Sequence, residues 1–149
     1  MTGPAIFAAV FAALYAAHSF GDHWIQTHHQ ACAKAAATRS GRLACLRHVT
    51  TLTLTKAVAV GAVVLVTDLP LSPPALLLGL AVDAGSHYWA DRRAPLARLA
   101  DLIGKRDFYR MGAPRPGTDD APHLGTGAYA LDQSWHHLWL FIAALIIAS

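Results

Sequence analysis

The 149-residue chain contains no glutamate, and charged residues of all kinds make up only 14% of it. Soluble domains carry about 25% charged residues, so this shortage disfavours an ordinary soluble surface and points toward lipid. The formal net charge of +3 is too small to favour a nucleic-acid partner. Only two cysteines are present, Cys32 and Cys45, and their spacing matches no metal-binding or redox motif. We therefore interpret both as reduced thiols.

Lysine and arginine are missing from long stretches of the chain. None occurs before Lys34, none lies between Lys56 and Arg92, and none follows Arg115. These stretches are apolar, and a segment needs about 20 apolar residues to cross a bilayer core. We therefore predict one all-α membrane domain, 1–149, in which four transmembrane helices form a bundle. The predicted helices span about 4–30, 42–66, 74–92 and 128–148.

A long connection, 93–127, separates the third predicted helix from the fourth. It is rich in glycine and proline, with room for one short helix from Pro95 to Ile103. The segments around this connection and around the one between the first two helices hold eleven of the twelve lysine and arginine residues. By the positive-inside rule both connections are cytoplasmic, and both termini lie outside. This asymmetry is the main sequence argument for a multi-pass membrane protein.

Histidine and aspartate recur four positions apart within the apolar segments. Residues with this spacing share one face of a helix, so each pair can point at a common centre. Ionisable residues inside a membrane are costly and are therefore functional candidates. The predicted topology brings these pairs, together with His48 at the start of the second helix, to a similar depth near the cytoplasmic face. The pairs are His18–Asp22, Asp83–His87–Asp91 and Asp132–His136.

Such a cluster needs a compensating charge, because carboxylates without a partner are costly near lipid. A divalent cation supplies that charge, and zinc, manganese or iron accepts nitrogen and oxygen ligands together. We favour zinc or manganese. The candidate ligands outnumber those of one tetrahedral ion, so either two metals bind or some residues orient the true ligands. The predicted metal set is His18, Asp22, His48, His87, Asp91, Asp132 and His136.

Other interpretations of the same residues stay open at this point. The cluster could be a hydrogen-bonded polar core without metal. Asp91 adjoins Arg92 and Arg93 and could simply pair with them. Asp132 could cap the fourth helix or interact with its dipole.

Lys56 and Asp83 indicate a separate interaction. At 1.5 Å rise per residue, Lys56 lies about 12 Å deeper than His48, and Asp83 lies about 6 Å deeper than His87. We predict that the two side chains form an ion pair between the second and third helices.

Four motifs occur in order along the chain. They are H-x-x-x-D-x-x-x-Q through His18, Asp22 and Gln26, then His48, then H-x-x-x-D through His87 and Asp91, and D-Q-x-x-H through Asp132, Gln133 and His136. The set resembles a family of small bacterial and phage integral membrane proteins that is classified as a domain of unknown function. That family is itself similar to bacterial inner-membrane metal-dependent hydrolases. The resemblance covers nearly the whole chain and implies a location in the bacterial inner membrane.

Two features of the chain depart from that family's pattern. His23 stands where the family often has phenylalanine, and the 93–127 connection is longer than in its short members. The resemblance therefore supports the fold and the candidate ligands more strongly than it supports a reaction.

The first function hypothesis is a metal-dependent hydrolase at the cytoplasmic face of the membrane, acting on an ester or phosphoester. Asp22, Asp91 or Asp132 is then the candidate general base, while Gln26 and Gln133 are candidates to orient water or substrate.

The expected partners of such an enzyme are membrane lipid and a phosphate-bearing headgroup. The basic loop that contains Tyr109, Arg110 and Arg115 is the candidate to hold that headgroup. No nucleic-acid partner is expected. The alternative hypothesis is a non-enzymatic metal- or proton-binding membrane protein that serves transport, sensing or assembly. A third is a soluble helical bundle with an alanine-rich core.

Overall fold

The chain is all-α over the residues that the computed structural model describes, 3–115, 117–118 and 125–149, as the sequence predicts. These residues form seven α-helices, one short π-helical segment (η1) and no strand. In chain order they are α1 (Gly3–Phe20), η1 (Gly21–Ile25), α2 (His28–Ala33), α3 (Arg39–Thr67), α4 (Pro73–Asp91), α5 (Ala94–Leu102), α6 (Arg106–Arg110) and α7 (Gly127–Ala148).

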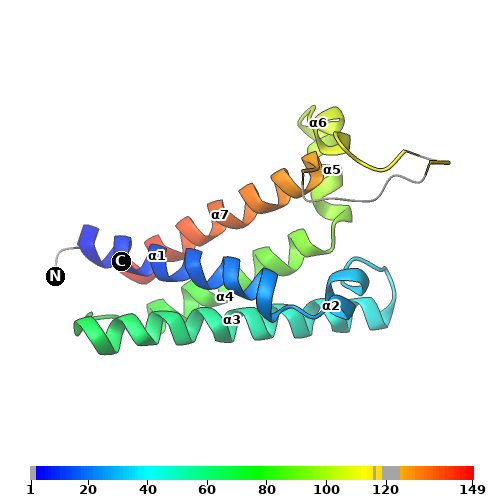
Figure 1. Cartoon of the computed structure of the whole chain (residues 1–149). Helices are drawn as coiled ribbons and strands as arrows, with labels where there is room; N and C mark the ends of the chain where they lie inside the picture. The colour runs from blue at the N-terminus through cyan, green and yellow to red at the C-terminus, as the bar shows by residue number, and fades with distance from the viewer. Residues whose placement is uncertain (1–2, 116, 119–124) are drawn as a thin grey trace.

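The four long helices α1, α3, α4 and α7 pack around one shared interior. α1 contacts α3 and α7, and α4 contacts the same two helices, so the four helices close a ring. Both termini and the α3–α4 connection lie at one end of this bundle (Figure 1). The short helices α2, α5 and α6 gather at the opposite end, which we call the cap end (Figure 1). The basic connections of the sequence therefore belong to the cap end.

The predicted continuous helix over 4–30 is interrupted. After Phe20 the backbone widens into the π-helical turn η1, in which the Gln26 N–H donates to the Gly21 carbonyl at 2.9 Å. Gln26 is extended, and Thr27 then starts α2. The Thr27 hydroxyl accepts from the Gln30 N–H, and the Gln30 amide oxygen accepts from the Thr27 N–H, which is a capping box. The chain therefore turns over the end of the bundle instead of extending as one straight rod.

The 93–127 connection is also more helical than predicted. It contains α5, close to the short helix anticipated from Pro95 to Ile103, and in addition α6; residues 116 and 119–124 of the connection lie outside the described residues. Gly127 ties α6 to the start of α7, because its N–H donates to the Met111 carbonyl at 2.8 Å. A Cβ at Gly127 would overlap the Phe108 carbonyl, so only glycine fits this approach.

The bundle interior is divided into an apolar half and a polar half. Near the termini the core is aliphatic, with Val10, Leu14, Val60, Leu140 and Ile147 all buried. Toward the cap end the buried side chains are histidine and aspartate instead.

The predicted ion pair of Lys56 and Asp83 lies between these two halves of the interior. The Lys56 Nζ is 2.6 Å from the Asp83 Oδ2, and both side chains are buried. The prediction of an interhelical ion pair is confirmed, and it joins α3 to α4.

Two segments, Gly3–Ile25 and Arg39–Thr67, are long and apolar enough to cross a membrane. By the same measure α4 and α7 are not apolar enough, because they carry the aspartates and histidines of the polar half. The four predicted spans are therefore supported for two of the four long helices.

We predict that Lys56→Met destabilises the protein by about 3–5 kcal/mol, because it leaves the buried Asp83 carboxylate without a partner. Thermal unfolding of the purified protein measures this, with Lys105→Met, at an exposed position, as the control. The double variant Lys56→Met/Asp83→Leu should recover most of the loss, since an apolar pair leaves no buried charge. A single variant as stable as the unchanged protein would contradict a structural role for the pair.

Candidate metal centre

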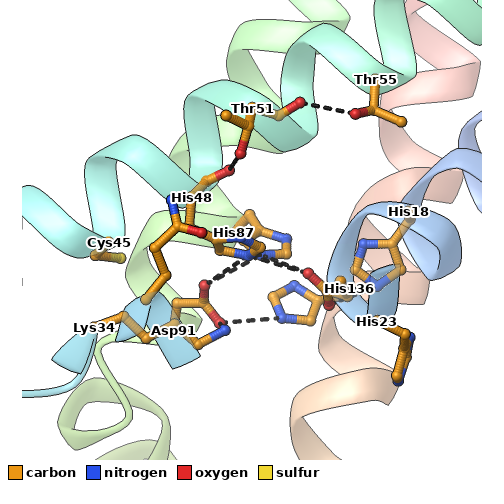
Figure 2. A network of polar contacts seen from close by, with 12 residues as sticks. His18, His23, Lys34, Cys45, His48, Thr51, Thr55, His87, Asp91 and His136 are labelled. Carbon is orange, nitrogen blue, oxygen red and sulfur yellow. Dashed lines mark hydrogen bonds and ion pairs between the residues drawn. The ribbon is translucent and has the colours of Figure 1, made fainter. Parts of the chain in front are cut away.

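All seven predicted ligands lie together in the polar half of the bundle. α1 supplies His18, η1 supplies Asp22 and α3 supplies His48, while the other four come in pairs. The pairs are His87 with Asp91 from the end of α4 and Asp132 with His136 from the start of α7. The rings of His48, His87 and His136 point toward the Asp91 carboxylate (Figure 2).

His48 is the most crowded member of the cluster. Its Nε2 lies 3.1 Å from the Asp22 Oδ1, 3.3 Å from the Asp91 Oδ2 and 3.1 Å from the His87 Nε2. The His87 Nε2 is in turn 3.3 Å from the same Asp91 oxygen. His48 and His87 are almost completely buried, so water does not surround these atoms.

These contacts exceed the hydrogens available to make them. A neutral imidazole has a single N–H, so the His48 Nε2 can serve at most one of its three neighbours. The Asp22 Oδ1, the Asp91 Oδ2 and the His136 Nε2 are buried without a hydrogen-bond partner among the described residues. Buried polar atoms without partners are costly, and they require an explanation such as an ion. A cation between these lone pairs would satisfy them together.

The spacing of the ligand atoms also fits a metal. Ligands about 2.0–2.1 Å from a tetrahedral zinc are about 3.4 Å from one another. Three groups of buried or partly buried residues have ligand atoms that all lie within 4.8 Å of one another. These groups are Asp22–His87–His136, His48–His87–Asp91 and Asp91–Asp132–His136. They could bind a metal ion, and their shared members make them one connected centre.

Asp91 and His136 link the two sides of this centre. The Asp91 Oδ2 faces His48 and His87, while its Oδ1 is 3.9 Å from the His136 Nε2. The His136 Nε2 is also 3.4 Å from the Asp132 Oδ2. The ring of His136 stacks on that of His87 with centroids 3.9 Å apart. One ion, or two neighbouring ions that share Asp91, can be held by this arrangement.

His18 lies beside the centre and is in none of the three groups that the described residues form. Its Nε2 is 3.6 Å from the Asp22 Oδ2, and its ring lies 5.1 Å from that of His136. Of the two roles that the sequence leaves open, this position fits orientation of Asp22 better than ligation.

Among the described residues Asp91 does not pair with Arg92 or Arg93, and Asp132 does not cap α7. Asp91 pairs with Lys34 at 2.8 Å, and the Arg92 guanidinium instead donates to the backbone carbonyls of Lys34 and Ala36. α7 is capped by Thr126, whose hydroxyl accepts from the Tyr129 N–H. The Asp132 carboxylate instead faces the centre, where its Oδ2 lies 3.4 Å from the His136 Nε2.

A cavity of about 430 Å³ adjoins the centre, since Asp22, Asp91 and Asp132 line it. The predicted catalytic residues all line it: Asp22, Gln26, Asp91, Asp132 and Gln133. Tyr109 of the basic loop lines it as well, whereas Arg110 and Arg115 are not among its lining residues. Lys34 and Arg93 take the basic positions instead.

Sequence reasoning missed several of these lining residues. In the sequence, Lys34 is one of several basic residues of a predicted cytoplasmic connection. The capping box at Thr27 is the signal that could have indicated that the chain turns back over the bundle. His23 and Tyr129 were also missed. The His23 Nδ1 donates to the Ser19 carbonyl at 2.8 Å, which leaves its Nε2 to accept from the Tyr129 hydroxyl at 3.2 Å.

Comparison with protein-family models, curated proteins and solved structures finds no match to this chain.

We predict that the purified protein contains zinc or manganese and that His48→Ala, His87→Ala or His136→Ala lowers its metal content at least tenfold. Loss of one ligand, or even of one group that orients a ligand, typically weakens metal affinity by about 10–100-fold. The matched control is His137→Ala, which changes the neighbour of His136 but lies outside all three groups. Elemental analysis after dialysis measures the metal content, and equal metal content in all four variants would contradict a metal centre at these residues.

Proposed function

We propose that the chain is a membrane-bound metal-dependent hydrolase whose centre works at the cytoplasmic face. The single observation that carries this proposal is the convergence of imidazole nitrogens and carboxylate oxygens that share too few hydrogens. Three carboxylates of this convergence, Asp22, Asp91 and Asp132, line a cavity through which a substrate could approach it. A buried metal site without access would favour a structural role instead.

The residues that would hold a metal are His48, His87 and His136 through their Nε2 atoms, with the Asp91 carboxylate beside them. Mixed imidazole and carboxylate ligands suit zinc or manganese. Such a cation supplies Lewis acidity and brings the pKa of water close to neutrality.

Asp132 is the favoured general base. Its side chain is 24% exposed and lines the cavity, whereas that of Asp91 is only 2% exposed and is surrounded by ring nitrogens. A base must reach both the water and the solvent that takes up the proton, which Asp132 can do. The Gln133 amide donates to Asp132 at 3.4 Å, and Gln26 lines the same cavity, so both are positioned to orient water or substrate.

The membrane location is supported by the outer surface of the bundle. Large apolar side chains on the long helices face outward, among them Leu65 at 82% and Val66 at 83% exposure, while polar groups fill one half of the interior. Only 22% of the apolar window of Arg39–Thr67 is buried within the protein, unlike the core helix of a soluble domain. Lipid is the partner that suits such a surface. The basic connections at the cap end then assign this end to the cytoplasm.

A transport role is less well supported. Beyond Lys56 and Asp83 the bundle interior consists of aliphatic side chains that are completely or almost completely buried. A transport pathway needs polar groups or water through the whole membrane thickness, and the described interior offers these in one half alone.

We predict that the full-length protein sediments with bacterial inner membranes and resists extraction by alkaline carbonate. Cys32 is exposed near the cap end and Cys45 is buried, so a membrane-impermeant maleimide should label Cys32 only after the membrane is opened. Cys32→Ser is the control for site-specific labelling. Recovery in the soluble fraction without detergent would contradict the membrane location.

We predict that the metal-loaded protein hydrolyses p-nitrophenyl phosphate or p-nitrophenyl acetate and that a chelator abolishes this activity. With metal in excess, Asp132→Asn should still lower kcat by about 100-fold or more, as expected for loss of a general base. Asp101→Asn, on the exposed face of α5, is the matched control. A rate that survives metal removal would contradict metal-dependent hydrolysis.

A further inference from the structure

The cavity has cations opposite its carboxylates. Lys34 and Arg93 line it together with Asp22, Asp91 and Asp132. Lys34 is nearly buried and pairs with Asp91. Arg93 is an exposed residue that lines the cavity, and its guanidinium makes no ion pair or hydrogen bond with any described residue. Arg93 is thus the one of these two cations without a partner, while the Lys34 ammonium, with three N–H groups, keeps donors besides the one that faces Asp91.

Several hydrogen-bond donors around the cavity also lack acceptors. The Gln26 Nε2 is buried and has no partner among the described residues. Tyr109 is half-buried beside Arg93, and burial raises the pKa of its phenol, which therefore remains protonated and able to donate. Unpaired donors from three separate segments thus border one space. An acceptor-rich, negatively charged group would satisfy all three.

The backbone at Arg93 supports a role for its side chain. Arg93 has φ of +56° at the junction of α4 and α5, a region that non-glycine residues rarely adopt. Such conformations persist where the surrounding structure requires them, and they are frequent at ligand sites. Glycine would suit this turn better, yet the chain places an arginine there.

We propose that this cavity binds the phosphate group of a phosphate monoester, with Arg93, Lys34, Gln26 and Tyr109 as its donors. The inference rests on the proposed hydrolase and names its substrate class. A phosphate dianion carries three terminal oxygens that accept several hydrogen bonds at once, and its charge matches the two cations. In hydrolysis the oxygen of one water forms a bond to phosphorus, the bond from phosphorus to the ester oxygen breaks, and a proton passes from the water to the leaving alcohol.

The charges of the cavity make phosphate binding depend on metal. Three carboxylates outnumber the two cations, so a phosphate dianion meets net negative charge until a divalent cation is bound. Metal and phosphate should therefore bind with positive coupling.

The test is calorimetric titration of inorganic phosphate, the product of the reaction, into the purified full-length protein with and without zinc. The metal-loaded protein should bind phosphate, and the metal-free protein should bind it at least tenfold more weakly. Arg93→Gln should weaken binding by about 10–100-fold, as expected for loss of charge-assisted hydrogen bonds. Arg98→Gln removes an exposed arginine of the same helix that does not line the cavity and should leave binding unchanged. Arg93→Gly provides a second variant that removes the guanidinium and suits the positive φ.

Metal content is measured on the same samples, which separates the two proposals. If metal is retained but phosphate does not bind, or binds equally well in both Arg93 variants, the phosphate inference is overturned and the metal centre stands. If the unchanged protein holds no metal, both are overturned.

Competition identifies the source of the monoester. Vesicles that contain phosphatidic acid and soluble glycerol 3-phosphate are each used to displace bound phosphate. Preference for either one supports a phosphate monoester and assigns it to lipid or to solution. Displacement by neither at millimolar concentration would overturn the substrate class.

Discussion

The arrangement of this protein depends on carboxylates and imidazoles that are buried together inside an apolar helical bundle. Such groups are costly to remove from water unless each finds an opposite charge or a hydrogen bond. The structure surrounds them with partners on two sides. Lys56 pairs with Asp83 on the side of the apolar core, and Lys34 pairs with Asp91 at the cap end. Between these two ion pairs, the buried ring nitrogens and carboxylate oxygens are too many for the N–H groups that could form hydrogen bonds among them. A bound metal ion would give these atoms the partner that they lack.

This constraint explains why the bundle is apolar outside and polar within one half. Apart from Lys56 and Asp83, the buried ionisable residues gather toward the cap end, so the aliphatic remainder of the interior can pack without interruption. Leucine and valine are consequently displaced to the outer surface of the same helices. This distribution and the scarcity of charged residues in the sequence are the two observations on which the proposed membrane location rests.

Much of the fold and of the candidate centre was readable from the sequence, because both depend on regular spacing along helices. The four-residue interval put His87 beside Asp91, and helix rise alone related Lys56 to Asp83. The remainder depends on contacts between distant segments, which spacing does not encode. The turn of Lys34 back onto Asp91 requires the break after Ile25. Hydropathy could not indicate that break, since the residues on both sides of it suit a helix, although the T-x-x-Q capping box could have done so.

The break in the first helix also separates two tasks within the molecule. Apart from Asp22 on η1, the candidate metal ligands of the three groups lie on the continuous helices α3, α4 and α7, whose positions are set by packing along the bundle. The groups proposed to bind the phosphate come instead from the ends of η1 and α2, the α4–α5 junction and α6, which are short and joined by a few hydrogen bonds. Short elements with few buried contacts open at lower free energy than a bundle core. A phosphate that bridges Gln26, Lys34 and Arg93 would hold these short elements together over the centre.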